Sequence, residues 1–291
     1  MMMKDALLDH LHLHVGCGVI YEVPHPTPIL FVVQAQDSGD QRVLRESRVI
    51  DPLVPVDQVL DSYGNTVWRM VAPAGTLRVR YDALVSVPAP PDLVLPHLRK
   101  TPIEALPGDA LSYLWPTRYC PSDRLIDDAW RLFGDVPGGW AQVQAVCDWM
   151  HTNIMYGAGS TSATDSLEVY AARRGVCRDF AHLAVTFCRA LNIPARYICG
   201  YLPDVGVEPD PTPMDFHAWF QVYLDGGWRT FDARHNRPRS GRTIIATGRD
   251  AVDGAWSTVF GSARLAQFQV WADEVDAAFT LDDSVAAQAK A

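Results

Sequence analysis

The most constraining feature of the sequence is a pair of β-forming runs, residues 217–224 and 227–232, separated by a single Asp-Gly pair. Asp-Gly between two such runs is a strong signal for a two-residue hairpin turn. In that register Asp232 falls opposite position 219, so His217 lies diagonal to it on the same face. Diagonal positions are about 7–8 Å apart at the backbone, within reach of longer side chains. We therefore expect the hairpin to bring an imidazole and a carboxylate together.

A second segment, residues 175–182, places a cysteine at the start of a predicted helix. Apolar residues recur at helical spacing after Cys177, and Asn192 and Pro194 end the pattern. The helix macrodipole favours an anion at this end by roughly 0.3–1 kcal/mol, and the thiolate is the reactive form of cysteine. Arg178 adds a positive charge beside it. The free amides of the first helical turn are candidate donors to an oxyanion.

Cysteine, histidine and aspartate occur here in the order of a nucleophile, a base and a group that orients the base. Taken singly, each residue has an ordinary structural interpretation. Cys177 reads as a buried thiol, His217 as a strand histidine and Asp232 as a strand-end carboxylate. Because order, spacing and element type agree, the three together predict thiol-dependent acyl transfer, with His217 as the base and Asp232 as its orienter.

The segment from about Trp115 to Phe268 resembles the bacterial transglutaminase-like superfamily of papain-like cysteine enzymes. The matching motifs are Gly-Val-Cys-Arg-Asp-Phe-Ala at 175–181, Ile-Pro-Ala-Arg-Tyr at 193–197, Gly-Tyr-Leu-Pro at 200–203, the His217 strand and Phe-Asp-Ala-Arg at 231–234. The resemblance implies a Cys177/His217/Asp232 triad and an α+β fold in which the cysteine-bearing helix packs on an antiparallel sheet. Members of the superfamily cross-link proteins, hydrolyse peptides or amides, or have lost activity.

The chain divides by pattern into a β-rich N-terminal domain (1–110), a catalytic domain (111–285) and a frayed tail (286–291). The β-rich part is similar to the region that often precedes such catalytic domains in bacteria. Candidate strands are residues 11–15, 29–34, 43–50, 66–72 and 76–87. Candidate helices are residues 123–133, capped by Ser122, and residues 140–154.

Composition excludes several classes of function. The net charge of −9 argues against nucleic-acid and anionic-membrane partners. No apolar run approaches the roughly 20 residues that span a bilayer, and residues 1–5 do not lead into the apolar core of a signal peptide. These features predict a cytoplasmic protein. The six cysteines form no CxxC pair, and Cys147, Cys188 and Cys199 are expected to be free core thiols.

Further candidates for the site come from the flanking segments. Tyr156 and Trp140 are candidate side-chain donors to an oxyanion, since such a donor must come from outside the cysteine helix. Asp179 is either a substrate contact or an acid favoured by the helix dipole.

Two loops are expected near the cleft. Tyr201 and Asp204 belong to an acidic, proline-rich loop that is a candidate for substrate binding. Arg234 begins a basic stretch that receives a substrate carboxylate or, by default, faces solvent as charge runs usually do. The other basic residues of that stretch are His235, Arg237, Arg239 and Arg242.

No metal or cofactor is expected. His10, His12 and His14 share one strand face in the predicted register, but they read as a polar outer face because no further ligand stands at a telling spacing. His182 follows the cysteine by five residues, and on a helix it points away from it.

The sequence therefore predicts an enzyme that forms a thioester at Cys177 on a peptide or protein amide. Hydrolysis is the first expectation, because amine transfer needs a water-excluding second channel that no residue pattern indicates. The alternatives are a protein-glutamine transglutaminase and a non-catalytic binding module that retains the fold.

Overall fold

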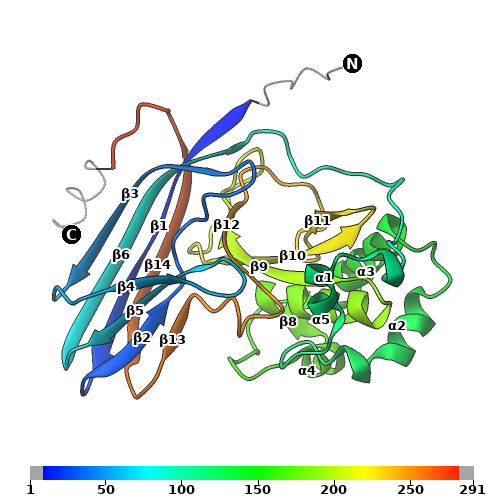
Figure 1. Ribbon diagram of the computed structural model, residues 1–291, viewed down its shortest axis with the longest axis horizontal. Coiled ribbons are helices and arrows are strands. Elements are labelled where there is room, and N and C mark those ends of the chain that lie inside the picture. Colours follow the sequence, from blue (N-terminus) through cyan, green and yellow to red (C-terminus); the bar gives the residue numbers. More distant parts are fainter. Residues whose placement is uncertain (1–8, 282–291) are drawn as a thin grey trace.

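The computed structural model describes residues 9–281 and has an α+β architecture in two parts (Figure 1). One part consists of two four-stranded sheets, and the other combines helices with a third four-stranded sheet. All three sheets are antiparallel. The expected fold class is therefore confirmed. The predicted tail, 286–291, lies outside the described residues.

The first part is a pair of sheets, drawn mainly in blue and cyan in Figure 1, that share one apolar core. One sheet has the strand order β14-β1-β6-β3 and the other has the order β13-β2-β5-β4. The strands are β1 (His10–Val23), β2 (Thr27–Phe31), β3 (Arg42–Asp51), β4 (Asp57–Leu60), β5 (Thr66–Ala72), β6 (Gly75–Pro88), β13 (Ser257–Val259) and β14 (Arg264–Val275). The five strands predicted from the N-terminal sequence correspond to β1, β2, β3, β5 and β6.

Two of these strands come from the C-terminal end of the chain. β14 pairs with β1 from His12↔Val275 to Glu22↔Arg264, and β13 pairs with β2. The sequence division assigned both strands to the domain 111–285, but they lie in the sheets of the N-terminal strands. The pairing covers the edge of β1 that β6 leaves open. The pairing joins segments from the two ends of the described chain, so no local sequence pattern predicts it.

The second part contains the helices and the sheet that carries His217. Its helices are α1 (Gly108–Leu111), α2 (Ile126–Phe133), α3 (Trp140–Asn153), α4 (Ser166–Ala172) and α5 (Cys177–Ala190), with 3-10 turns at Ile103–Ala105, Ser112–Leu114 and Ser122–Arg124. Its strands are β7 (Met155–Tyr156), β8 (Arg174–Gly175), β9 (Ala195–Tyr201), β10 (His217–Leu224), β11 (Gly227–Phe231) and β12 (Thr243–Gly248). The main sheet has the order β11-β10-β9-β12.

Helix α5 is central to this part. Every residue from 179 to 190 is buried, and the helix packs on β10 and β9 with α2, α3 and α4 around it. Its apolar side chains form one core with α2, α3 and β10. The other core extends from the N-terminal sheets to Tyr197, Cys199 and Tyr201 of β9, so the two parts are packed together. The cysteine helix on an antiparallel sheet is thus confirmed.

The helix predictions were correct in position but not in every cap. α3 matches the expected 140–154 helix. Residues 122–124 form a 3-10 turn, and α2 starts at Ile126 without a side-chain cap. Ser122 is only 3% exposed and does not cap the helix, so the predicted cap is wrong.

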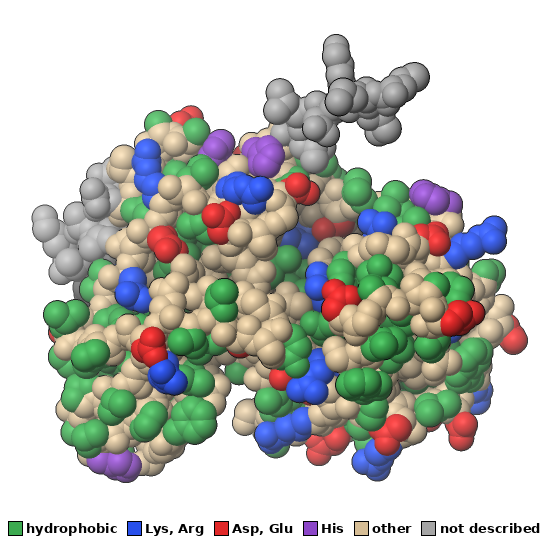
Figure 2. Space-filling model, in the orientation of Figure 1, with side chains coloured by type: hydrophobic (Ala, Val, Ile, Leu, Met, Phe, Trp, Pro, Cys, Tyr) green, Lys and Arg blue, Asp and Glu red, His purple; other side chains and the backbone are tan. Residues whose placement is uncertain are grey.

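Within residues 9–281, no helix combines the length and the apolar character that crossing a bilayer requires. On the face shown in Figure 2, acidic and basic side chains are interspersed rather than gathered into a basic patch.

Candidate active site

Cys177 is the first residue of α5, and it is half-buried. Val176 before it is extended, with φ −101° and ψ 179°, and its carbonyl accepts hydrogen bonds from the backbone N–H groups of Asp179 and Phe180 at 2.9 and 3.0 Å. The chain therefore changes from strand to helix at the cysteine. The thiol lies beside the backbone amides of Cys177 and Arg178, which as the first two amides of the helix have no acceptor within it.

Asp179 stabilises this turn. Its carboxylate accepts a hydrogen bond from the backbone N–H of Val176 at 2.9 Å and pairs with Arg178 at 2.9 Å. A side-chain carbon on Gly175 would lie 2.7 Å from Cβ of Asp179, so a glycine permits the close approach. Asp179 is fully buried. Its carboxylate therefore caps this turn, and Asp179 is not among the residues that line the cleft beside Cys177.

The β10–β11 hairpin has the register that the sequence predicts. Leu224 pairs with Gly227 and Phe220 with Phe231. Both turn residues, Asp225 and Gly226, have positive φ, at 43° and 78°, as a two-residue hairpin turn of this kind requires. Residue 232 follows directly after β11 and so comes within reach of the first residue of β10.

His217 and Asp232 are hydrogen-bonded through this hairpin. The imidazole Nε2 donates to Oδ2 of Asp232 at 2.8 Å, and the two residues are 5% and 6% exposed. Burial opposes a charge on the imidazole, but Asp232 and the thiol of Cys177 favour it more strongly and raise the pKa of His217 above 6.5. The thiol also donates to the carbonyl of Phe216 at 3.7 Å. The structure thus brings the three predicted residues together.

The carboxylate of Asp232 is fully engaged. Oδ1 accepts from the backbone N–H groups of Arg234 and His235 at 3.1 and 3.2 Å. Oδ2 accepts from His217 and from Nη2 of Arg242 at 3.1 Å. Burial favours the neutral acid, but His217 and Arg242 outweigh it and hold the pKa of Asp232 well below 3.8.

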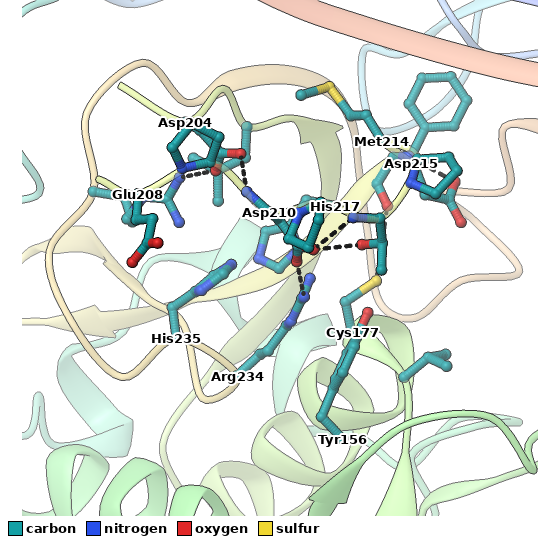
Figure 3. Close-up of a pocket in the computed structure, with 18 of the residues that line it drawn as sticks. Tyr156, Cys177, Asp204, Glu208, Asp210, Met214, Asp215, His217, Arg234 and His235 are labelled. Atoms are coloured by element: carbon teal, nitrogen blue, oxygen red, sulfur yellow. Dashed lines mark hydrogen bonds and ion pairs between the residues drawn. The ribbon is translucent and has the colours of Figure 1, made fainter. Parts of the chain in front are cut away.

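Cys177 and His217 border a cleft of about 670 Å³ (Figure 3). One wall is the loop between β9 and β10, residues 202–216, and the opposite wall is formed by Tyr156 and the loop after β11.

Two ion pairs join the loops on either side of the cleft. Asp204 pairs with Arg239 at 3.0 Å, and Asp210 pairs with Arg234 at 3.4 Å. All four residues line the cleft, as expected for Asp204 and Arg234. The basic stretch is therefore only partly solvated, since Arg239 is 3% exposed whereas Arg237 is exposed at the rim of the cleft.

The two candidate oxyanion donors lie in different places. Tyr156 pairs with Gly175 in the short β7–β8 sheet, two residues before the nucleophile, and Figure 3 shows its hydroxyl directed toward Cys177. The guanidinium of Arg234 lies 3.8 Å from the centre of the Tyr156 ring. Trp140 packs on Phe231 and lines a separate cavity of about 60 Å³ behind Asp232. It does not line the cleft of Cys177, so Tyr156 is the candidate that the geometry supports.

Tyr201 is not a substrate contact. It is fully buried in the core between the two parts, and its hydroxyl donates to the carbonyl of Val33 at 3.0 Å. The alternation of β9 turns it toward the N-terminal sheets. The prediction that it binds substrate is wrong, because the sequence does not show that a second layer covers this side of β9.

His182 lies outside the cleft, as the helical spacing predicts. It is fully buried, stacks on Tyr119 with ring centroids 5.0 Å apart, and accepts at Nε2 from the backbone N–H of Ala251 at 3.1 Å. Burial lowers the pKa of His182 to about 3, so the ring is neutral.

Within residues 9–281, the side chains whose ligand atoms converge are those of His217, Asp232 and His235, within 4.8 Å of one another. Because both oxygens of Asp232 already accept hydrogen bonds from the chain, we read this group as part of the Cys177 site. The N-terminal histidines have other partners: His14 bonds Asp82 at 2.9 Å and His10 bonds Ser86 at 3.0 Å.

The sequence did not predict two residues, Arg242 and Asp92, whose side chains lie behind the His217–Asp232 pair. Arg242 belongs to the predicted basic stretch, yet it contacts Asp232, and Asp92, in the segment that follows β6, contacts Arg242. Arg242 follows Asp232 by ten residues, and no local periodicity links them. The sequence offered only a proline-rich segment after residue 88 that contains Asp92, and a basic stretch after Asp232.

A cysteine at the start of a buried helix, facing a strand histidine held by an aspartate, is the arrangement of papain-like cysteine enzymes. Residues 134–233 match the model of the transglutaminase-like superfamily. A crystal structure described as a putative cysteine protease from Cytophaga hutchinsonii has a TM-score of 0.85 and 35% identity, over 94% of this chain and 93% of that one.

Two curated relatives match parts of this chain. An uncharacterised protein of Mycobacterium tuberculosis is 30% identical over 75% of this chain and 76% of its own length. Another, from Mycobacterium leprae, is 31% identical over 49% of this chain and 52% of its length, so the match spans about half of that relative. The chain belongs to the transglutaminase-like superfamily.

Proposed function

We propose that the protein is a cysteine peptidase or amidase that works through a thioester at Cys177. The observation that carries the proposal is the buried hydrogen bond of 2.8 Å between His217 and Asp232, with the thiol of Cys177 near enough to the imidazole to raise its pKa and with Cys177 and His217 both lining the cleft. A raised pKa for His217 is what a base needs in order to hold the proton of the thiol.

In acylation, the thiolate of Cys177 attacks the carbonyl carbon of the substrate, and the negative charge moves to the carbonyl oxygen. The amides of the first turn of α5 and the hydroxyl of Tyr156 are the donors that would stabilise it. The proton held by His217 passes to the leaving nitrogen, the C–N bond breaks, and an amine leaves. Asp232 keeps the imidazole in the required tautomer and stabilises its charged form.

In deacylation, His217 takes a proton from water, the oxygen attacks the thioester carbonyl, and the thiol is regenerated with release of a carboxylic acid. An amine acceptor would give a new amide instead. The small cavity behind Asp232 does not include Cys177 in its lining, and so it offers no second approach to the thioester. This supports water as the acceptor.

The proposal is tested by labelling the protein with iodoacetamide from pH 5 to pH 9 and reading the modification of each cysteine by mass spectrometry. The other five cysteines are buried and serve as internal controls. We expect selective labelling of Cys177 well below the roughly 8.5 pKa of a free thiol, and its loss in His217→Gln. Labelling of Cys177 no faster than an ordinary thiol would instead support the binding module.

The acyl acceptor is tested separately. A peptide library digested in ¹⁸O-water, with and without a primary amine probe, distinguishes the two outcomes. Incorporation of ¹⁸O into product carboxylates supports hydrolysis, whereas amine incorporation into glutamine supports the transglutaminase alternative.

A cytoplasmic location and the lack of nucleic-acid or membrane partners stay predictions from the sequence, which cell fractionation tests.

A further inference from the structure

Arg242, which precedes β12, makes two charged contacts at once. Its Nη2 donates to Oδ2 of Asp232 at 3.1 Å, the oxygen that also accepts from His217. Its Nε lies 3.0 and 2.9 Å from the two oxygens of Asp92. The Arg242 and Asp232 side chains are 8% and 3% exposed, so little solvent screens this pair.

Asp92 is itself held in place. It belongs to the connector that follows β6, and its Oδ2 accepts from the backbone N–H of Arg239 at 3.0 Å. Its backbone N–H donates to the carbonyl of Arg239 at 3.0 Å. The guanidinium of Arg242 also lies 5.0 Å from the ring centre of Trp219. The connector therefore holds Arg242 at the back of the His217–Asp232 pair.

The charge that His217 experiences comes from several elements. Cys177 faces it from α5 and Asp232 from the end of β11. His235 lies 5.0 Å from it, between ring centroids, but burial lowers its pKa to about 3 and keeps it neutral. Asp215, on the loop before β10, is near enough for the two charges to interact, and burial raises its pKa.

Arg242 is the cation of this set that contacts Asp232 directly. A cation there interacts with the Asp232 carboxylate and so weakens the attraction between that carboxylate and a protonated imidazole. Asp92, on the other side of Arg242, interacts with the guanidinium and so weakens the effect of Arg242 on Asp232. The alternating order Asp92, Arg242, Asp232, His217 therefore determines how strongly the imidazolium is stabilised.

We propose that Arg242 is a positioning residue of the triad, and that Arg242 and Asp92 together set how firmly His217 holds its proton. The proposal rests on the proposed function, since it presupposes the triad. Its distinctive consequence is that removing the cation and removing the acid behind it have opposite effects on the same imidazole.

The test is an NMR titration of the protein with ¹⁵N-labelled histidine side chains, in which His217 is assigned by its loss in His217→Gln. Arg242→Met should raise the midpoint of His217 by about 1 pH unit, because a nearby cation is removed. Asp92→Asn should lower it by a smaller amount. Arg242→Lys, which keeps the charge, should stay close to the parent.

Arg196→Met is the matched control. It removes an arginine from β9 whose guanidinium bonds the side chain of Gln221 rather than an acid. The midpoint of His217 should not change in this variant. A change as large as that of Arg242→Met would show that loss of any arginine of this sheet is sufficient, and would overturn the proposal.

The proposal is also overturned if Arg242→Met and Asp92→Asn move the midpoint in the same direction, or not at all. Should Arg242→Met fail to fold, Asp92→Asn and Arg242→Lys decide, since the first must lower the midpoint and the second must preserve it. Iodoacetamide labelling of Cys177 in the parent separates the two proposals. An activated Cys177 with an immobile His217 midpoint would overturn the positioning role alone.

Discussion

His217 and Asp232, the first residue of β10 and the residue after β11, share a buried hydrogen bond of 2.8 Å. The two are brought together by a hairpin whose turn, Asp225-Gly226, has positive φ at both residues. The imidazole and the carboxylate that it contacts therefore belong to one hairpin, which limits their relative motion. Cys177 comes from a different element, α5, that packs on the same sheet.

Substitution of the triad should reduce turnover unequally. Cys177→Ala should abolish it, since loss of a triad nucleophile costs on the order of 10⁶ in rate, and His217→Ala should cost a similar amount. Asp232→Ala should cost less, on the order of 10⁴. The measurement is kcat/KM on a peptide from the library digest, with thermal melts to confirm folding. Cys177→Ala with the activity of the parent would contradict the assignment.

Tyr156→Phe should lower the rate of acylation without changing the reactivity of the thiol. A lost oxyanion donor costs about 10²-fold or more in kcat, whereas alkylation by iodoacetamide forms no oxyanion. Single-turnover kinetics and iodoacetamide labelling separate the two effects. Tyr170→Phe, which removes a hydroxyl bonded to Asp128 on the other side of the helices, is the control. Equal losses of labelling and acylation would mean that Tyr156 acts on Cys177 itself.

Asp179→Ala should destabilise the protein by roughly 1–2 kcal/mol, because the backbone N–H of Val176 loses its acceptor. It should also slow labelling of Cys177, because the first turn of α5 frays at the thiol. Urea denaturation measures the first effect. Asp165→Ala removes the N-cap carboxylate of α4, which accepts from the backbone N–H groups of Leu167 and Glu168, and should cost about 1 kcal/mol with normal labelling. A fully stable but inactive Asp179→Ala would restore the substrate-contact interpretation.

His182 should make the fold sensitive to mild acid. Its pKa is lowered to about 3 by burial, so the unfolded chain binds a proton below about pH 6.5 that the folded chain does not. Stability from this group is complete above pH 6.5 and is lost as the pH falls toward 3. The loss between pH 7 and pH 5 should be about 2 kcal/mol.

Urea denaturation of His182→Gln at the two pH values tests this. Glutamine keeps an acceptor for Ala251 but does not titrate, so stability should depend less on pH than in the parent. His97→Gln, at an exposed position, should behave as the parent does. An unchanged pH dependence in His182→Gln would contradict the buried neutral state.

Residues close in sequence were predicted with the greatest accuracy. The hairpin register followed from the Asp-Gly turn and the two-residue period of strands, and α5 followed from its apolar spacing. Asp204 and Arg234 were placed at the cleft because the segments that carry them flank the triad. The same reasoning also placed Tyr201 and Trp140 at the cleft, where the structure does not have them. The periodicity of a strand or helix shows which residues share a face, but not which layer covers that face.

By itself, the sequence determined the elements that bear Cys177, His217 and Asp232, since turn chemistry and periodicity act over a few residues. Only the tertiary structure decided that β14 closes the N-terminal sheet, and that Asp92 and Arg242 complete the contacts behind the triad. The β1–β14 pairing and the Asp92–Arg242 contact join segments more than a hundred residues apart. They depend on which surfaces pack together, and that is settled by the burial of the whole chain rather than by any local pattern.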